Sequence, residues 1–355
     1  MATNIDSMLL GLCTTYNPRA ATASPGPRKP MEPRYPRYRD ETGPLPDQPE
    51  IMDLCKRFWD LEVTSVRRAN SRCVFFCDSL RDGRVVFRVN PGWDGSTHPK
   101  TIVEFVRHLA DRGAPCPDIR PTTDGSLYKS VRDLMISVES FLEGEVVDRV
   151  DTLHNVGEAL ARVHDASEDF PAYLSEVKNA QEYISDALEY CERTTFSSAA
   201  ADAVTRLRAQ LNNTPNKMDV RWLFCRRDVR SWNTIASPSG EVRFTDFNSA
   251  HFAPALEDVV MVRMQWLMGT VGRQLTDEEM QRFVEGYFSV RPPSDDERTA
   301  LPFIFAAYYA KRLCQLHRKW GPKSPNRRTW GLEDRILALP DAAIRMGEAA
   351  IEGID

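Results

Sequence analysis

Hydrophobic periodicity changes once along this 355-residue chain, near Gly144, and this change limits the folds that the chain can adopt. Before Gly144 the apolar runs 74–77 and 85–89 are strand-like and flank an Asp82-Gly83 pair, a strong signal for a hairpin turn. After Gly144, apolar residues recur every three or four positions, starting with the stretch 148–166. The sequence therefore predicts an α+β class, with a small antiparallel β-rich part followed by a larger helical part.

Two amphipathic stretches add helices to the β-rich part. Residues 51–59 and 100–112 carry apolar side chains at helical spacing, and Gly113 stands where the second helix would end. At 42% hydrophobic residues, a chain of this length exceeds the roughly 250–300 residues at which single cores stop growing. We expect an N-terminal lobe at 51–143 and a helical C-terminal lobe at 144–355.

Composition narrows the environment and the partners. Residues 1–50 hold nine of the 24 prolines and predict a disordered tail, which could also dock a partner. The net charge of −5 argues against nucleic-acid binding, and no apolar run reaches the ~18 residues of a membrane span. The eight cysteines contain no C-x-x-C pair, which favours a reducing cytoplasm. The sequence leaves the oligomeric state open.

A polar loop within the helical part carries the residues best suited to chemistry. Asp228 lies five positions before Asn233, and Asp246 follows 13 positions later, after the β-prone segment 241–244. Amide and carboxylate oxygens suit Mg²⁺, which keeps substrate phosphates in its coordination shell. Asp228 can accept the proton of an attacking hydroxyl or orient that hydroxyl. This set predicts phosphoryl transfer, which depends on positioning and charge stabilisation.

The ordered motifs resemble those of the aminoglycoside phosphotransferase and choline kinase superfamily. Its catalytic loop usually reads H-G-D-x-H-x-x-N and its metal strand I-D-F, and Asp228, Asn233 and Thr245-Asp246-Phe247 match those positions. The resemblance covers most of residues 60–320 and implies a bilobal protein-kinase-like fold. It implies that Asp228 is catalytic and that Asn233 and Asp246 hold Mg²⁺.

The same resemblance implies the reaction. ATP or GTP would give its γ-phosphoryl group to a hydroxyl of a small molecule: an aminoglycoside or other antibiotic, a choline-like alcohol, homoserine or a sugar. The acidic net charge is compatible with a cationic acceptor. Residues after Asp246 would form most of the acceptor pocket.

Nucleotide-binding positions in the N-terminal lobe also follow from the resemblance. Asn70 and Ser71 would belong to a short phosphate loop, and Arg88 stands on the strand that carries a phosphate-binding lysine in the family. Glu104, on the next helix, occupies the place of the glutamate that pairs with this cation. Residues 138–144 resemble the hinge, where backbone groups of Ser140 and Phe141 would bind adenine.

Further segments and departures complete the resemblance. Residues 156–164 are similar to a family helix that ends in Leu-His, and Asp258 falls where an aspartate helps to hold the catalytic loop. Arg226 and Arg230 replace the two loop histidines, the first of which braces the loop against the metal strand. Because of these arginines and of Arg88, a catalytically silent kinase-like binding module is the alternative hypothesis.

Overall fold

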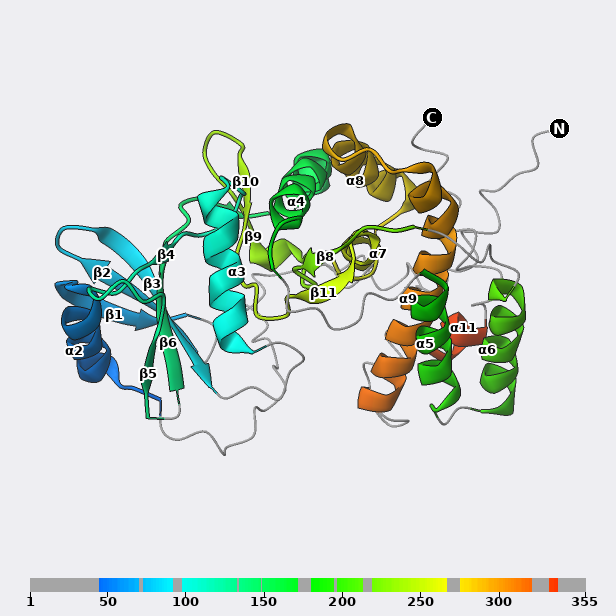
Figure 1. Ribbon diagram of the computed structural model, residues 1–355, viewed down its shortest axis with the longest axis horizontal. Coiled ribbons are helices and arrows are strands. Elements are labelled where there is room, and N and C mark those ends of the chain that lie inside the picture. The colour runs from blue at the N-terminus through cyan, green and yellow to red at the C-terminus, as the bar shows by residue number, and fades with distance from the viewer. Residues whose placement is uncertain are drawn as a thin grey trace, which may run out of the picture. The chain divides into compact units, whose positions relative to one another are not determined.

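The computed structural model describes residues 45–69, 73–91, 98–132, 134–147, 149–171, 180–194, 197–212, 219–266, 275–320 and 332–337, all within the unit Thr42–Asp355 (Figure 1). Asn70 and Ser71, and most of the proline-rich segment, lie outside the described residues. Helix α2 (Gln48–Trp59) begins within the segment predicted as tail, because the Asp47 side chain caps it by accepting the Glu50 N–H at 2.9 Å.

A six-stranded antiparallel sheet follows α2, with strand order β1-β2-β3-β6-β4 and β5 paired to β6. The strands are β1 (Val63–Arg68), β2 (Val74–Ser79), β3 (Gly83–Pro91), β4 (Ile119–Arg120), β5 (Lys129–Val131) and β6 (Leu134–Ser140). The predicted hairpin is present, since Ser79 pairs with Gly83 where β2 turns into β3. The order places β3 and β6, which are distant in sequence, side by side at the centre of the sheet.

The two faces of this sheet serve different purposes. One face packs Phe87 and Ile136 against Trp59 of α2 in a separate hydrophobic core. Met135 lies on the opposite face and packs into the larger core with Phe105 of helix α3 (Pro99–Asp111). Because side chains alternate along a strand, that second face also carries the polar residues between the core positions of β3 and β6.

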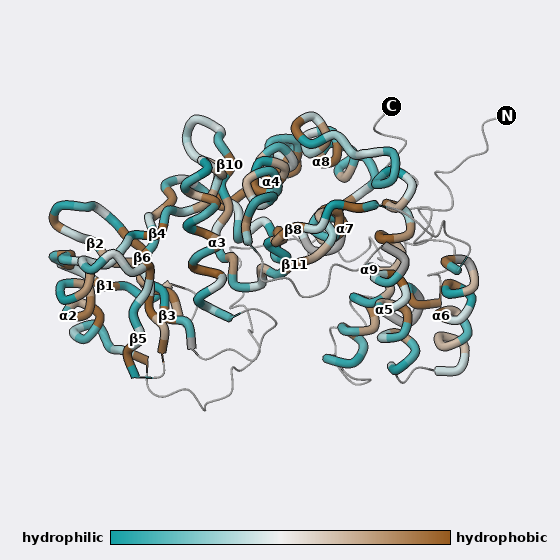
Figure 2. The backbone as a smooth tube through the Cα atoms, viewed as in Figure 1, coloured by the Kyte–Doolittle hydropathy of each residue, from teal (hydrophilic) through white to brown (hydrophobic). Residues whose placement is uncertain are grey.

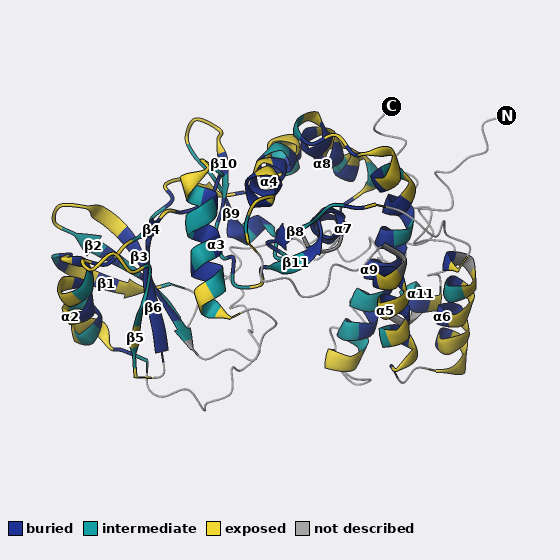
Figure 3. Ribbon diagram, in the orientation of Figure 1, coloured by how far each residue is buried: buried dark blue, intermediate teal, exposed yellow. Residues whose placement is uncertain are grey.

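The remaining helices build the larger core. They are α4 (Leu153–Ser167), α5 (Ala180–Glu192), α6 (Ser198–Leu211), α7 (Leu256–Gln265), α8 (Asp277–Val290), α9 (Asp295–Trp320) and α11 (Leu332–Leu337). Their hydrophobic stripes in Figure 2 coincide with the buried residues in Figure 3. Helices α4 and α8 cross where a Cβ on Gly157 would lie 2.1 Å from the Phe283 carbonyl oxygen, so only glycine permits this approach.

Short strands carry the predicted polar loop. Strands β10 (Val242–Phe244), β9 (Thr234–Ala236) and β7 (Glu145–Val146) form one small sheet, and β11 (His251–Pro254) pairs with β8 (Trp222–Cys225) in another. The predicted α+β class is confirmed. Among the described residues, no helix has the length and apolar character needed to cross a membrane.

Candidate active site

The loop between β8 and β9 brings Asp228 and Asn233 together. A one-turn 3₁₀ helix, η3 (Ser231–Asn233), turns the chain back so that Asn233 Nδ2 donates to Asp228 Oδ2 at 2.7 Å. Arg230 Nε lies 2.5 Å from the other Asp228 oxygen, Oδ1. Since the Asn233 nitrogen is the donor, its side-chain oxygen remains an acceptor that can bind a cation.

Asp246 follows β10 and is tied to the same loop. The Thr245 N–H donates to the Asn233 backbone oxygen at 2.9 Å, so the two predicted metal ligands are neighbours in space. The Asp246 backbone has a φ of 59°, and 42% of its side chain is exposed. One amide oxygen and one accessible carboxylate form a donor set that fits Mg²⁺, because this ion completes its shell with water and phosphate oxygens.

Arg88 links the sheet to these acidic residues. Its Nη1 lies 3.7 Å from Asp246 Oδ1, while its Nε and Nη2 donate to Glu139 Oε1 and Oε2 at 2.8 and 3.1 Å. Burial opposes the charge of Arg88, but the carboxylates of Glu139 and Asp246 outweigh burial and raise its pKa. The predicted phosphate-binding cation therefore stands beside a predicted metal ligand.

Glu104 does not pair with Arg88, and the prediction of this ion pair is wrong. Glu104 Oε1 lies 3.7 Å from Lys100 Nζ, one turn away on α3. Glu139 takes the predicted place because β3 and β6 are adjacent and put Arg88 and Glu139 on one face, two residues apart in register. A single acidic residue within the buried strand β6 was the sequence signal for this pairing.

The contacts at the end of β6 limit which backbone groups of the predicted hinge could bind adenine. The Ser140 N–H donates to the Asp118 backbone oxygen at 2.8 Å, and its Oγ accepts the Asp118 N–H at 2.9 Å. Adenine could use the Ser140 N–H only if this pair broke. The Phe141 ring packs edge-on against Phe76 and lies beneath the guanidinium of Arg84, at 5.6 and 5.3 Å between centres. Adenine binding at Phe141 stays a prediction.

Arg226 braces the rear of the loop. It is fully buried, and its guanidinium donates to the backbone oxygens of Asp228 at 2.6 Å and of Thr245. The guanidinium carbon lies 4.7 Å from the Phe244 ring centre and 5.2 Å from that of Phe247. Arg226 thus joins the catalytic loop to the metal strand, which is the role implied for the histidine that it replaces.

Asp258 holds the backbone of the same loop, as the resemblance implied. Its oxygens accept the N–H groups of Arg226 and Arg227 at 3.0 and 2.8 Å, and His164 Nε2 lies 3.1 Å from Oδ2. Hydrogen bonds to the carboxylate offset its burial and lower the pKa of Asp258.

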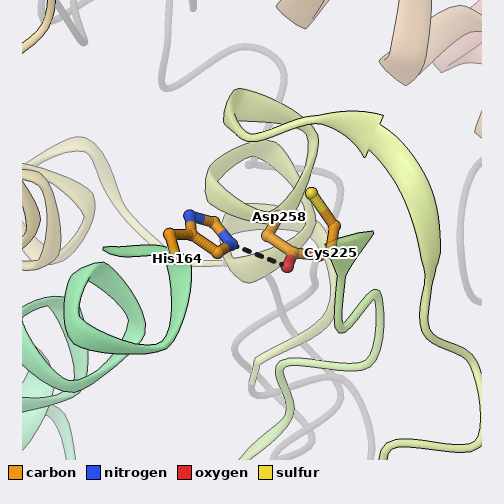
Figure 4. A group of neighbouring side chains, drawn as sticks. All are labelled: His164, Cys225 and Asp258. Carbon is orange, nitrogen blue, oxygen red and sulfur yellow. Dashed lines mark hydrogen bonds and ion pairs between the residues drawn. The ribbon is translucent and has the colours of Figure 1, made fainter. Parts of the chain in front are cut away.

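Figure 4 shows His164, Cys225 and Asp258 converging, with ligand-type atoms within 4.8 Å of one another. The protein already satisfies these atoms. His164 Nδ1 bonds the Tyr287 hydroxyl at 2.8 Å, and the Cys225 thiol donates to the Ala253 carbonyl oxygen at 3.5 Å. Burial raises the pKa of Cys225, so it stays a protonated thiol. We therefore interpret the cluster as a structural brace and not as a metal site.

Arg227 is a residue that sequence reasoning missed. Its φ of 60° lies in the left-handed region, where the family loop has glycine and where other residues pay roughly 1–2 kcal/mol. Its guanidinium is held by Glu257, with Nε 3.0 Å from Oε1, and lies 5.9 Å from the Tyr308 ring centre on α9. An arginine at the glycine position of the motif was the available signal.

Comparisons with known proteins agree with this geometry. Residues 62–302 match the model of the phosphotransferase enzyme family, APH. The homoserine kinase of Janthinobacterium sp. (strain Marseille) is 27% identical over 255 residues, which are 67% of this chain and 76% of that protein.

Solved structures share the fold. The amicoumacin kinase hAmiN, in complex with AMP-PNP, Ca²⁺ and Ami, has a TM-score of 0.61 at 14% identity and covers 83% of this chain and 93% of its own. The microcompartment-associated aminopropanol kinase has a TM-score of 0.59 at 15% identity, with 82% and 96% covered. These identities show the fold alone, and they confirm the predicted kinase-like fold.

The family match covers more than half of the chain and includes the catalytic loop and the strand before Asp246. The chain therefore belongs to the phosphotransferase enzyme family, whose members are small-molecule phosphotransferases.

Proposed function

We propose that this protein transfers the γ-phosphoryl group of ATP or GTP to a hydroxyl of a small molecule, with Mg²⁺ as the metal. The observation that carries the proposal is the convergence of three groups with separate tasks. Arg88 lies 3.7 Å from Asp246, and Asn233 bonds Asp228 at 2.7 Å while its backbone oxygen accepts the Thr245 N–H. A cation, a metal-type carboxylate and a base-type carboxylate therefore share one site.

The nucleotide side of the site is organised around Arg88. Asn233 and Asp246 would hold Mg²⁺, which when bound neutralises phosphate charge. Arg88 would bind phosphate oxygens with Nη1, the nitrogen not engaged by Glu139. Glu139 positions this guanidinium through two hydrogen bonds and so reduces the ordering cost of binding phosphate.

Asp228 would accept the proton of the acceptor hydroxyl. Burial raises the pKa of Asp228, whereas the charge of Arg230 lowers it. A raised pKa makes the carboxylate a stronger base, while its hydrogen bond from Asn233 fixes its direction. The structure thus supplies both an orientation and a proton-accepting oxygen at one residue.

The names of two similar proteins suggest the size of the acceptor. A homoserine kinase and an aminopropanol kinase take their names from short amino alcohols, which is the class that we propose to test first. The supply of ATP and the seven free cysteines of the described chain also fit the cytoplasm, which we propose as its compartment.

Two measurements test the proposal. Thermal unfolding of the full chain with AMP-PNP should show stabilisation that requires Mg²⁺, and Asp246→Ala should abolish this metal dependence because a charged ligand is lost. A mass-spectrometric screen of short hydroxylated metabolites and antibiotics with ATP should then find a product heavier by one phosphoryl group.

The alternative hypothesis, a silent nucleotide-binding module, predicts a different pair of results. Nucleotide would stabilise the protein with or without Mg²⁺, and no acceptor would gain a phosphoryl group. Those results would overturn the proposed reaction. The structure gives the alternative less support than the sequence did, because Arg226 fulfils the bracing role of the missing histidine.

A further inference from the structure

Helix α9 brings positive charge to the acceptor side of the catalytic loop. The guanidinium carbon of Arg227, in the loop, lies 5.9 Å from the centre of the Tyr308 ring on this helix. Helix α9 also packs against α7 (Figure 1). Arg312 lies four residues after Tyr308, and Lys319 lies eleven residues after it. At the spacing of an α-helix, both side chains therefore lie near the helix face that carries Tyr308. This face therefore continues past the loop that carries Asp228.

In the described chain Arg312, like Arg226, has no carboxylate partner, but Arg226 is held by backbone oxygens of the loop whereas Arg312 is not. In the part of the chain that the structure describes, its Nη1 donates to Gln315 Oε1 at 3.1 Å, and its buried Nε has no hydrogen-bond partner. Arg88, Arg227 and Arg230 are each paired with a carboxylate. Arg312 is half-buried, and a charge that is partly removed from water is stabilised by a counterion, which an anionic ligand would supply.

Arg312 lies about one helical turn from Tyr308, which contacts the loop, and about two turns from Lys319. Burial lowers the pKa of Arg312, and the charges of Arg230 and Arg227 lower it further, while Asp228 acts in the opposite direction. Burial also lowers the pKa of Lys319, with contributions from Arg312 and Arg230. Arg230, Arg312 and Lys319 thus form one group, which we call the acceptor cation cluster.

We propose that the acceptor cation cluster binds an anionic oxygen group, a carboxylate or a phosphate ester, on the hydroxyl acceptor. This inference rests on the proposed function and specifies its substrate class. The guanidinium of Arg312 can donate to such a group through its terminal nitrogens. The negative net charge of the whole chain is compatible with a cationic acceptor, but the local charge beyond Asp228 is positive.

The bound anion also has a consequence for Asp228. Arg230 Nε lies 2.5 Å from Asp228 Oδ1, and its guanidinium lies 5.0 Å from the Trp232 ring centre. An anion held by Arg312 competes with Asp228 for Arg230. The acceptor would therefore weaken the ion pair that restrains the base, and Asp228 would become free to accept the hydroxyl proton.

The test compares acceptors that differ only in the anionic group. L-homoserine and 3-aminopropan-1-ol differ by a carboxylate, as do glycerate and glycerol, and glycerol 3-phosphate replaces the carboxylate by a phosphate ester. Phosphoryl transfer by the full chain is followed by ADP release and by product mass. We expect the anionic member of a pair to have the higher kcat/KM, by about tenfold or more.

Arg312→Gln should raise KM for the anionic acceptors by about tenfold or more and leave the neutral analogues unchanged, and Arg312→Lys should restore part of the affinity. Arg318→Gln is the matched control, because Arg318 of the same helix lies over the Tyr190 ring of α5. Arg312→Gln should unfold at a temperature close to that of the parent protein, since it removes a half-buried cation that has no carboxylate partner in the described chain. Equal KM increases for neutral and anionic acceptors would overturn the inference.

Thermal stabilisation by glycerate, glycerol 3-phosphate or homoserine in the presence of AMP-PNP gives a readout that does not need turnover. Stabilisation by the anions that Arg312→Gln removes supports the cluster even if no acceptor is phosphorylated, in which case the proposed function fails and the binding site stands. Preference for glycerate over glycerol 3-phosphate, or the reverse, identifies the type of anion. Absence of any anion-dependent stabilisation or preference would contradict the cluster's role.

Discussion

The catalytic loop has a rear side and a front side that treat charge differently. At the rear, Asp258 accepts two loop N–H groups and contacts His164, and Arg227 is neutralised by Glu257. At the front, Asp246 has 42% of its side chain exposed, and the buried Nε of Arg312 has no partner in the described chain. Most charged groups at the rear are paired, although the buried Nε of Arg226 has no partner in the described chain, and the front contains charges that ligands would complete.

This difference separates the residues that hold the shape of the site from those that we propose to perform its chemistry. A buried network of paired polar groups rigidifies the backbone that it holds. The front residues contribute little to that rigidity, and their incomplete pairing is what allows phosphate, metal and acceptor to bind. Rear variants should therefore change stability first, whereas front variants should change turnover and leave the fold intact.

The largest expected effect belongs to a front residue. Asp228→Asn should reduce kcat by at least about a thousandfold, or about 4 kcal/mol, because the amide cannot accept the hydroxyl proton. The unfolding temperature and Mg²⁺-dependent stabilisation by AMP-PNP should stay close to those of the parent protein. Steady-state kinetics checks the first expectation. Retained turnover would remove Asp228 from the base position.

A rear residue gives the opposite pattern. Asp258→Asn should lower the free energy of unfolding by about 3–5 kcal/mol, because the loop N–H groups and His164 lose a buried anion. Urea unfolding measures this loss. Asp60→Asn is the control, because Asp60 pairs with Lys56 at the exposed surface and its substitution should change stability much less. Equal effects of the two variants would erase the distinction between rear and front.

Sequence reasoning reached the front of the site more completely than the rear. Asp228, Asn233 and Asp246 were predicted because five- and 13-residue spacings within one loop and hairpin are local properties. Asp258 was placed only through the family resemblance. The β-to-helix order was also readable, because hydrophobic periodicity reports each element by itself.

The missed features depend on contacts between distant segments. Arg88 and Glu139 are 51 residues apart and meet only because β3 and β6 pair. Arg312 stands on a helix whose orientation toward the loop is set by tertiary packing, and its lack of a counterion cannot be recognised before its neighbours are known. Local spacing therefore predicted the candidate catalytic and metal-binding residues, and long-range packing decided their partners.

Acid provides a further way to probe the rear network. Burial and the neighbouring charge of Arg227 lower the pKa of His251 to about 3, from the ordinary value of 6.5. Between these values the unfolded chain binds more protons than the folded one, so stability present above pH 6.5 is lost as pH falls toward 3, by at most about 1.4 kcal/mol per pH unit.

His251→Asn should therefore lose less stability than the parent protein between pH 7 and pH 5, as measured by urea unfolding. Asp258 does not interfere in this window. Its pKa is lowered by hydrogen bonds, so its contribution is present above the ordinary aspartate value and declines only at more acidic pH. An unchanged pH slope in the variant would show that His251 is protonated normally in the folded protein.

A moderate effect is expected at the residue that positions Arg88. Glu139→Gln keeps the size of the side chain but weakens the two hydrogen bonds that orient the guanidinium. KM for ATP should rise by about tenfold, equivalent to about 1.4 kcal/mol, with a smaller change in kcat. Kinetics at saturating acceptor measures both constants. A rise in kcat/KM for ATP would mean that Glu139 competes with phosphate for Arg88 instead of positioning it.

The smallest effect sharpens the choice between two glutamates. Glu104→Gln should leave KM for ATP within about twofold of the parent value and change stability by less than about 0.5 kcal/mol, because Glu104 forms only a partly exposed i,i+4 pair with Lys100. Comparing KM for ATP between this variant and Glu139→Gln shows which carboxylate supports Arg88. A tenfold loss of ATP affinity in the Glu104 variant alone would mean that nucleotide binding moves α3 toward Arg88. In that case the front of the site would be completed by a conformational change as well as by its ligands.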